Sequence, residues 1–180
     1  MKNSIYLYQL FLLVIISFPA YSQTDVSVNP IGLLFRSIDA SIEQSLSESF
    51  GLEGSANFNF NSYNVLGDEL NSNGFGIRAL GKYYFKPEKG TDKFHIGPYA
   101  RVGYNSINFS KDKVGNFRFA IGFYVGYKWV SQKNIIFEIG LGIGRAFINK
   151  YSSDDSSFNI NDWPDFNVDG TGKLAIGYRF

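Results

Sequence analysis

This 180-residue sequence is poor in Cys and His, two of the residue types that enzymes use most often as nucleophile or base. There is no Cys and only one His, which is His95. Nucleophilic catalysis would pair that imidazole with a nearby hydroxyl and an acid, but Gly97 stands two residues after His95. We therefore predict no catalytic residues and no enzyme activity.

A second candidate is an acidic stretch near the C-terminus. Asp165, Asn167, Asp169 and Gly170 match the first half of a calcium loop, D-x-[DN]-x-[DN]-G. The second half fails, because Lys173 stands where a ligand should supply an oxygen. We interpret the stretch as a turn that leads into a strand and expect no metal and no cofactor, with weak calcium binding left open.

The remaining candidates are charged residues that recur at alternate positions. From Phe117 to Trp129, every odd position is apolar or aromatic, whereas Arg118 and Lys128 stand at even positions among Ala, Gly and Tyr. A period of two is typical of a β-strand with two different faces. After a turn the same rule resumes, with Glu138 on the polar face. These residues predict a β-hairpin.

The composition of the polar face indicates which side of the hairpin is inside. It consists of Gly and Ala with single charges, as expected where a sheet closes around a narrow interior. The apolar face must then point outward, and an outward apolar band is typical of a transmembrane β-barrel. A soluble, lipocalin-like barrel with an apolar interior is the alternative.

The same alternation predicts an all-β fold, an eight-stranded antiparallel up-and-down transmembrane β-barrel. The predicted strands cover about 26–35, 38–46, 50–60, 75–85, 94–104, 117–129, 135–147 and 171–180. In the first strand, a change of parity at Asn29-Pro30-Ile31 indicates a bulge, and a turn near Arg36-Ser37 should follow. The longer polar segments are predicted to be cell-surface loops, namely 61–74, 106–116 and 148–170.

Charged side chains gather on the predicted inner face. The expected lumen network consists of Glu43, Glu53, Arg78, Lys82, Arg101, Arg118, Lys128, Glu138 and Arg179, with Asp39 and Lys173 beside them. Because an eight-stranded lumen has room only for side chains, these charges should pair with one another and close it. Counting from the short turns sets Glu53 level with Lys82, and Lys128 level with Glu138. A narrow path for ions or small solutes is the alternative.

The N-terminal segment 1–22 is predicted to be a signal peptide. Lys2 precedes an apolar run from about Leu10 to Phe18, and small residues follow. Cleavage before or after Gln23 would leave a barrel domain at 23–180. Loss of Lys2 takes the 17 basic residues to 16, which equals the 16 acidic ones, so we expect no nucleic-acid partner.

The alternating strands, the signal peptide and the final Gly177-Tyr178-Arg179-Phe180 resemble the small outer-membrane β-barrel proteins of Gram-negative bacteria, of the OmpX/OmpA-barrel type. The resemblance implies a location in outer-membrane lipid. It also implies that barrel-assembly machinery recognises Tyr178 and Phe180 as an assembly signal. The opening of the barrel domain is similar to uncharacterised exported barrel families, for which no activity is implied.

For function, these observations favour a non-enzymatic monomer with a structural or surface-binding role through its extracellular loops. The segment 151–170 is the longest of these loops, and we expect it to contact an unknown surface ligand or protein. A narrow channel and a lipid-modifying outer-membrane enzyme are the alternatives.

Overall fold

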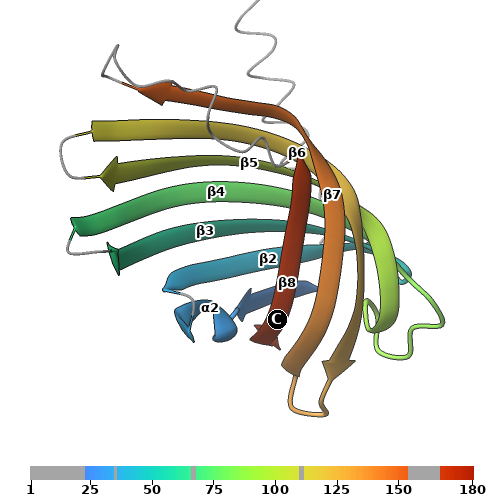
Figure 1. The fold of residues 1–180 in the computed structure, drawn as a ribbon. Helices are drawn as coiled ribbons and strands as arrows, with labels where there is room; N and C mark the ends of the chain where they lie inside the picture. The colour runs from blue at the N-terminus through green and yellow to red at the C-terminus, as the bar shows by residue number, and fades with distance from the viewer. Residues whose placement is uncertain (1–22, 35, 66–67, 110–111, 154–166) are drawn as a thin grey trace, which may run out of the picture.

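Eight antiparallel strands form a closed ring in the computed structural model, which describes residues 23–34, 36–65, 68–109, 112–153 and 167–180 (Figure 1). Each strand pairs with its neighbours in sequence, and β1 pairs with β8. The strands are β1 (Thr24–Val28), β2 (Ser37–Ser47), β3 (Phe50–Val65), β4 (Asp68–Tyr84), β5 (Lys93–Phe109), β6 (Asp112–Val130), β7 (Ile135–Ser153) and β8 (Val168–Arg179). The predicted all-β, up-and-down arrangement of eight strands is confirmed.

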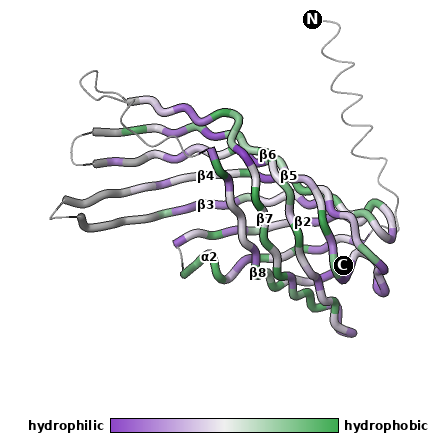
Figure 2. The backbone as a smooth tube through the Cα atoms, turned by 45° about the vertical axis from the view of Figure 1, so that its right-hand side comes forward, coloured by the Kyte–Doolittle hydropathy of each residue, from purple (hydrophilic) through white to green (hydrophobic). Residues whose placement is uncertain are grey.

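The two faces of the strands differ as the alternation predicts. Phe123 and Ile139 are exposed on the outside of the ring, whereas Lys128 and Glu138 are buried inside it. Figure 2 shows hydrophobic positions alternating with paler or hydrophilic ones along the strands in the body of the ring. Buried charges fill the interior formed by the described residues, which contradicts the alternative of a barrel with an apolar core.

The hairpins on one side of the ring are longer than the sequence suggests. Most of the predicted loops 61–74 and 106–116 is strand, because β3 and β4 pair as far as Val65 and Asp68, and β5 and β6 as far as Phe109 and Asp112. Backbone groups pair in this way whatever the side chains are, so a polar composition did not indicate a loop. Strands β3 to β7 thus continue beyond the ends of β2 and β8 (Figure 1).

The connection between β1 and β2 also differs from the prediction of a long first strand with a bulge. Strand β1 ends at Val28 and a single helical turn, α2 (Ile31–Leu34), follows. Pro30 has no N–H to give to a ladder, but its fixed φ suits the start of a helix. Leu33 N donates to the Pro30 carbonyl at 3.2 Å. No helix among the described residues is long and apolar enough to cross a membrane.

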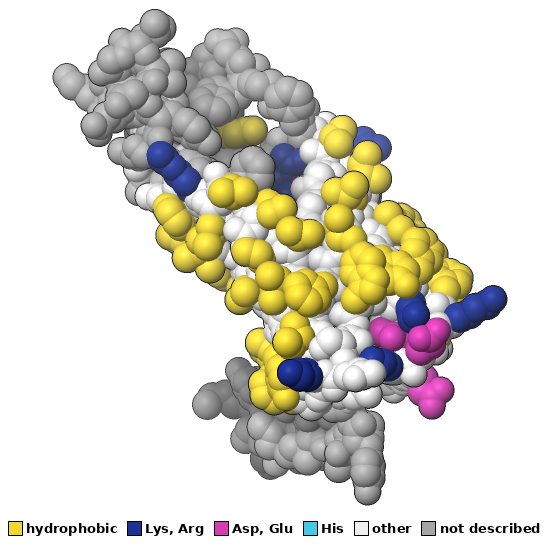
Figure 3. Space-filling model, turned by 90° about the horizontal axis from the view of Figure 1, so that it is seen from below, with side chains coloured by type: hydrophobic (Ala, Val, Ile, Leu, Met, Phe, Trp, Pro, Cys, Tyr) yellow, Lys and Arg dark blue, Asp and Glu magenta, His cyan; other side chains and the backbone are white. Residues whose placement is uncertain are grey.

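Exposed aromatic residues follow the outer face in two rows. Register pairing places Phe58, Phe75, Tyr104 and Phe117 side by side across β3 to β6. A second row lies ten residues away along β4 to β7, which gives the pairs Phe75 and Phe85, Phe94 and Tyr104, Phe117 and Tyr127, and Phe137 and Phe147, and on β3 Phe50 lies eight residues from Phe58. Figure 3 shows hydrophobic side chains spread across the visible face between the ends of the molecule.

Gly97 lies where β4 approaches β5 too closely for a side chain. A Cβ atom at this position would overlap the carbonyl oxygen of Gly81. We predict that Gly97→Ala lowers the free energy of unfolding by about 1–3 kcal/mol, because the backbone must shift to admit the methyl group. Urea unfolding of the refolded protein in micelles measures this change.

The matched control is Gly54→Ala, because a Cβ atom at Gly54 would meet nothing within 4 Å. The control should leave the urea midpoint unchanged or raise it. Equal losses for the two variants would show that glycine flexibility, and not the close approach to Gly81, sets the effect.

Candidate functional site: the charged lumen

The centre of the lumen holds one ammonium group among three carboxylates. Lys82 Nζ lies 2.7 Å from Glu43 Oε2, 2.5 Å from Glu53 Oε2 and 2.7 Å from Glu138 Oε1. Glu43, Glu53 and Lys82 come from the adjacent strands β2, β3 and β4, whereas Glu138 comes from β7. We call these four residues the Lys82 cluster. It joins opposite walls of the ring.

Two further lysines complete the pairing of these acids. Lys173 Nζ lies 2.8 Å from Glu53 and 2.9 Å from Glu138. Lys128 Nζ lies 2.8 Å from both Asp25 and Glu43. All of these side chains are buried. The strong attraction between charges in a dry interior offsets part of the cost of removing them from water.

Arginines pair with two of the buried acids, Glu53 and Asp25. Arg78 donates to Glu53 at 3.3 Å and to the Thr171 hydroxyl at 2.6 Å. Arg179 donates to the two oxygens of Asp25 at 2.7 and 2.8 Å. Because Asp25 is on β1 and Arg179 on β8, this bidentate pair bridges the strands that close the ring.

The acids of the Lys82 cluster are also the kind of group that binds a metal. Carboxylate oxygens of Glu43, Glu53 and Glu138 lie within 4.8 Å of one another. The ammonium of Lys82 already lies between them. A divalent cation would have to displace that buried charge, so the geometry favours an internal salt bridge.

His95 lies at the edge of the same cluster. Its Nε2 is 3.2 Å from Glu138 Oε1 and its Nδ1 is 3.1 Å from the Lys93 carbonyl oxygen. The imidazole ring stacks on Tyr124 and lies tilted against Tyr84. His95 is fully buried, and a substrate therefore has no direct access to the imidazole in this conformation.

The structure corrects one of the two predicted levels and confirms the other. Gly51, not Glu53, is the register partner of Lys82, although the long Lys82 side chain still reaches Glu53. Lys128 is level with Glu138 as predicted. Its ammonium nevertheless turns to Asp25 and Glu43.

Arg101 and Arg118, also predicted lumen residues, lie apart from the Lys82 cluster. Both guanidinium groups contact the buried carboxylate of Asp169, with Arg118 Nε 3.6 Å from Asp169 Oδ1. Tyr99 donates to the other oxygen of Asp169 at 2.8 Å. Asp39, on β2, is half-buried opposite Asn57 of β3.

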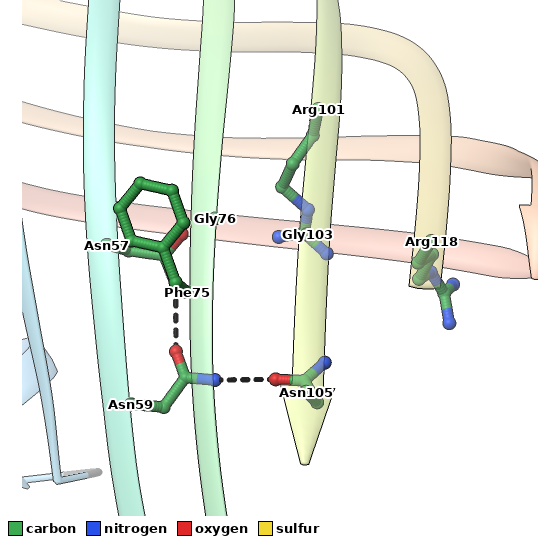
Figure 4. A pocket seen from close by; sticks show the side chains of 8 residues that line it. All are labelled: Asn57, Asn59, Phe75, Gly76, Arg101, Gly103, Asn105 and Arg118. Atoms are coloured by element: carbon green, nitrogen blue, oxygen red, sulfur yellow. Dashed lines mark hydrogen bonds between the residues drawn. The ribbon is translucent and has the colours of Figure 1, made fainter. Parts of the chain in front are cut away.

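Above these arginines the lumen opens into a cavity of about 160 Å³, lined in part by Asn57, Asn59, Arg101, Gly103, Asn105 and Arg118. We call this cavity the mouth pocket (Figure 4). Asn57 donates to Asn59 at 2.8 Å, and Asn59 donates to Asn105 at 3.0 Å. The pocket lies near the start of β2, since Asn59 pairs with Ser37. It therefore faces the long hairpins.

The sequence reasoning missed two acids that the lumen uses, Asp25 and Asp169. Both follow the parity of inward residues, because Asp169 lies four residues before Lys173, and Asp25 precedes the buried Ser27 by two. Extending each alternation toward the strand start would have found them. The calcium pattern includes Asp169, but its carboxylate contacts Arg101 and Arg118 instead. Asp165, the first residue of that pattern, lies outside the described residues.

We predict that Lys82→Met lowers the free energy of unfolding by about 3–5 kcal/mol, because it leaves three buried carboxylates without their shared counter-charge. The urea midpoint of the refolded protein measures the loss. Lys133→Met is the matched control, since Lys133 is exposed in the turn before β7. A Lys82→Met protein as stable as this control would contradict the assigned role of the ammonium.

A family model described as "Protein of unknown function (DUF3575)" matches residues 7–176 of the chain. No curated protein matches the chain. The match spans most of the ring, and the description of the family names no activity, ligand or partner.

Proposed function

The chain belongs to the DUF3575 family, and we propose that it is a non-enzymatic outer-membrane β-barrel protein with a closed lumen. In this proposal it contributes to the envelope and acts at the cell surface through its long hairpins and loops. The observation that carries the proposal is a ring with an apolar outside and a salt-bridged inside. That arrangement is the reverse of a soluble barrel.

The two aromatic rows support a membrane location. Ten residues at about 3.3 Å each make about 33 Å along a strand. With the usual strand tilt of about 35–45°, the rows would lie about 25 Å apart across a membrane. Outer-membrane barrels carry an apolar band of about that height between two aromatic girdles.

Trp129 provides a test of this location. It is half exposed on the outer face beside Tyr127, with ring centroids 4.4 Å apart. We predict that, in vesicles, lipids brominated near the headgroup quench its fluorescence more strongly than lipids brominated at the bilayer midplane, because girdle residues lie at the interface. The variant Trp163→Phe leaves Trp129 as the only reporter.

The control is the same protein held unfolded in urea with the same vesicles, where bromine should have little effect. Absence of quenching at either depth in the folded protein would refute membrane insertion. In that case the closed lumen would belong to a ring that is not inserted in a membrane.

The Lys82 cluster supports a closed lumen. It spans the interior from β2, β3 and β4 to β7, and its side chains are almost fully buried. An ion that passed this point would have to separate buried charge pairs, which is costly. The alternative of a narrow channel is therefore disfavoured.

We predict that the refolded protein gives no large, stable single-channel steps in planar bilayers. The matched variant Glu138→Gln removes one carboxylate that Lys82 and Lys173 share and should raise the frequency of brief openings. Stable steps in the unaltered protein would favour the channel function instead.

Export and assembly are part of the same proposal. The predicted signal peptide at 1–22 lies outside the described residues. At the other end, Tyr178 and Phe180 are exposed on the outer face, with ring centroids 5.0 Å apart. Their outward position is compatible with the proposed assembly signal.

A closed lumen leaves the rims as the places where this protein can act. The rim with the long hairpins offers more surface than the rim of short turns. The proposed binding loop 151–170 belongs to that rim, but both ends of the predicted loop are strand, because β7 continues to Ser153 and β8 begins at Val168. Its residues 154–166 lie outside the described part of the chain.

A further inference from the structure

We propose that the mouth pocket binds a small oxyanion, such as a phosphate or carboxylate group. The site consists of the guanidinium groups of Arg101 and Arg118 with the side-chain amides of Asn57, Asn59 and Asn105. It lies inside the ring, so the inference goes beyond the proposed membrane location and does not depend on it.

The charges inside the ring balance when all of them are counted. Among the described residues, the inward cations are Arg78, Lys82, Arg101, Arg118, Lys128, Lys173 and Arg179, and the inward or buried acids are Asp25, Asp39, Glu43, Glu53, Asp92, Glu138 and Asp169. Asp92, however, lies in the turn before β5, where it accepts from the backbone N–H groups of Glu88 and Lys89. Because charges removed from water need partners nearby, the local distribution of charge is what favours a bound anion.

At the mouth pocket the cations outnumber the carboxylates that contact them. Two guanidinium groups there share one carboxylate, that of Asp169, which also accepts from Tyr99. No acidic residue lines the pocket, since Asp39 and Asp169 both lie outside its lining. The pocket therefore presents positive charge to a solute.

Hydrogen-bond donors in the pocket also exceed the acceptors. The Nε of Arg118 is buried and has no hydrogen-bond partner among the described residues, and 3.6 Å from Asp169 is too long to be one. The amide chain runs from Asn57 to Asn59 to Asn105 (Figure 4). Its last member, Asn105, accepts within the chain and keeps its NH₂ group for another acceptor.

The size and shape of the pocket limit the ligand. One water molecule takes roughly 30 Å³ in the liquid. A cavity of about 160 Å³ therefore holds a phosphate ion or the acidic group at the end of a larger solute, and is too small for a folded polypeptide. Gly76 and Gly103 create this space. They lie between Asn57 and Arg118 in one row of register partners across β3 to β6.

Isothermal titration calorimetry of the refolded protein in a non-ionic detergent at low salt tests the proposal. The probes are inorganic phosphate, galacturonate and its neutral counterpart galactose. We expect at least one of the two anions to bind and galactose not to bind. We also expect affinity to fall as salt is added, because salt screens partly exposed charges.

Two variants alter the pocket in different ways. Arg118→Gln removes one charged donor and should weaken anion binding about tenfold or more. Gly103→Val keeps every charge but fills the space, since the nearest atom to an added Cβ is the Phe75 carbonyl oxygen at an ordinary 3.6 Å. It should abolish binding. The matched control, Arg145→Gln, changes an exposed arginine of β7 and should leave affinity unchanged.

The outcomes separate the site from general attraction to a charged protein. Binding of phosphate alone would assign the pocket to phosphate groups, and binding of galacturonate alone would assign it to acidic sugars. The proposal is wrong if neither anion binds, if galactose binds equally well, or if folded Gly103→Val retains full affinity. Heat-modifiable migration on gels establishes that each variant is folded.

Discussion

The ammonium of Lys82 lies within 2.7 Å of carboxylate oxygens on three other strands, and the rest of the ring depends on this contact. Burying four charges is costly unless each has a partner at the correct distance. A slip of one residue in any of these strands would turn its charged side chain to the apolar outer face. The cluster therefore selects one register for β2, β3, β4 and β7 at the same time.

This constraint divides the lumen into two parts. Around Lys82 the charges are satisfied by one another and are closed to solvent. Toward the long hairpins, Arg101 and Arg118 are partly exposed and share a single acid, Asp169. The fully buried ion pairs are thus concentrated in the closed part, and the open part holds the pocket that we propose binds a small oxyanion.

The alternation of apolar and polar side chains is visible in the sequence. For this reason the sequence alone predicted the strands and the inward position of Glu138 and Lys128. The partners of these charges depend on the shear of the ring and on the reach of long side chains. Lys128 accordingly pairs with Asp25 and not with Glu138. The long hairpins were missed because Asn and Ser side chains do not show whether their backbone is paired. The helix α2 was missed because the role of Pro30 depends on where the backbone pairing of β1 ends.

Closure of the ring relies on its shortest strand. Strand β1 has five residues and pairs with β8 only from Asp25 to Val28, so few backbone bonds hold the two ends of the sheet together. The bidentate contact of Asp25 with Arg179 compensates at this seam. Backbone bonds between Thr24 and Phe180 extend the seam by one further residue pair, so the junction of the first and last strands depends on a short ladder and one buried ion pair.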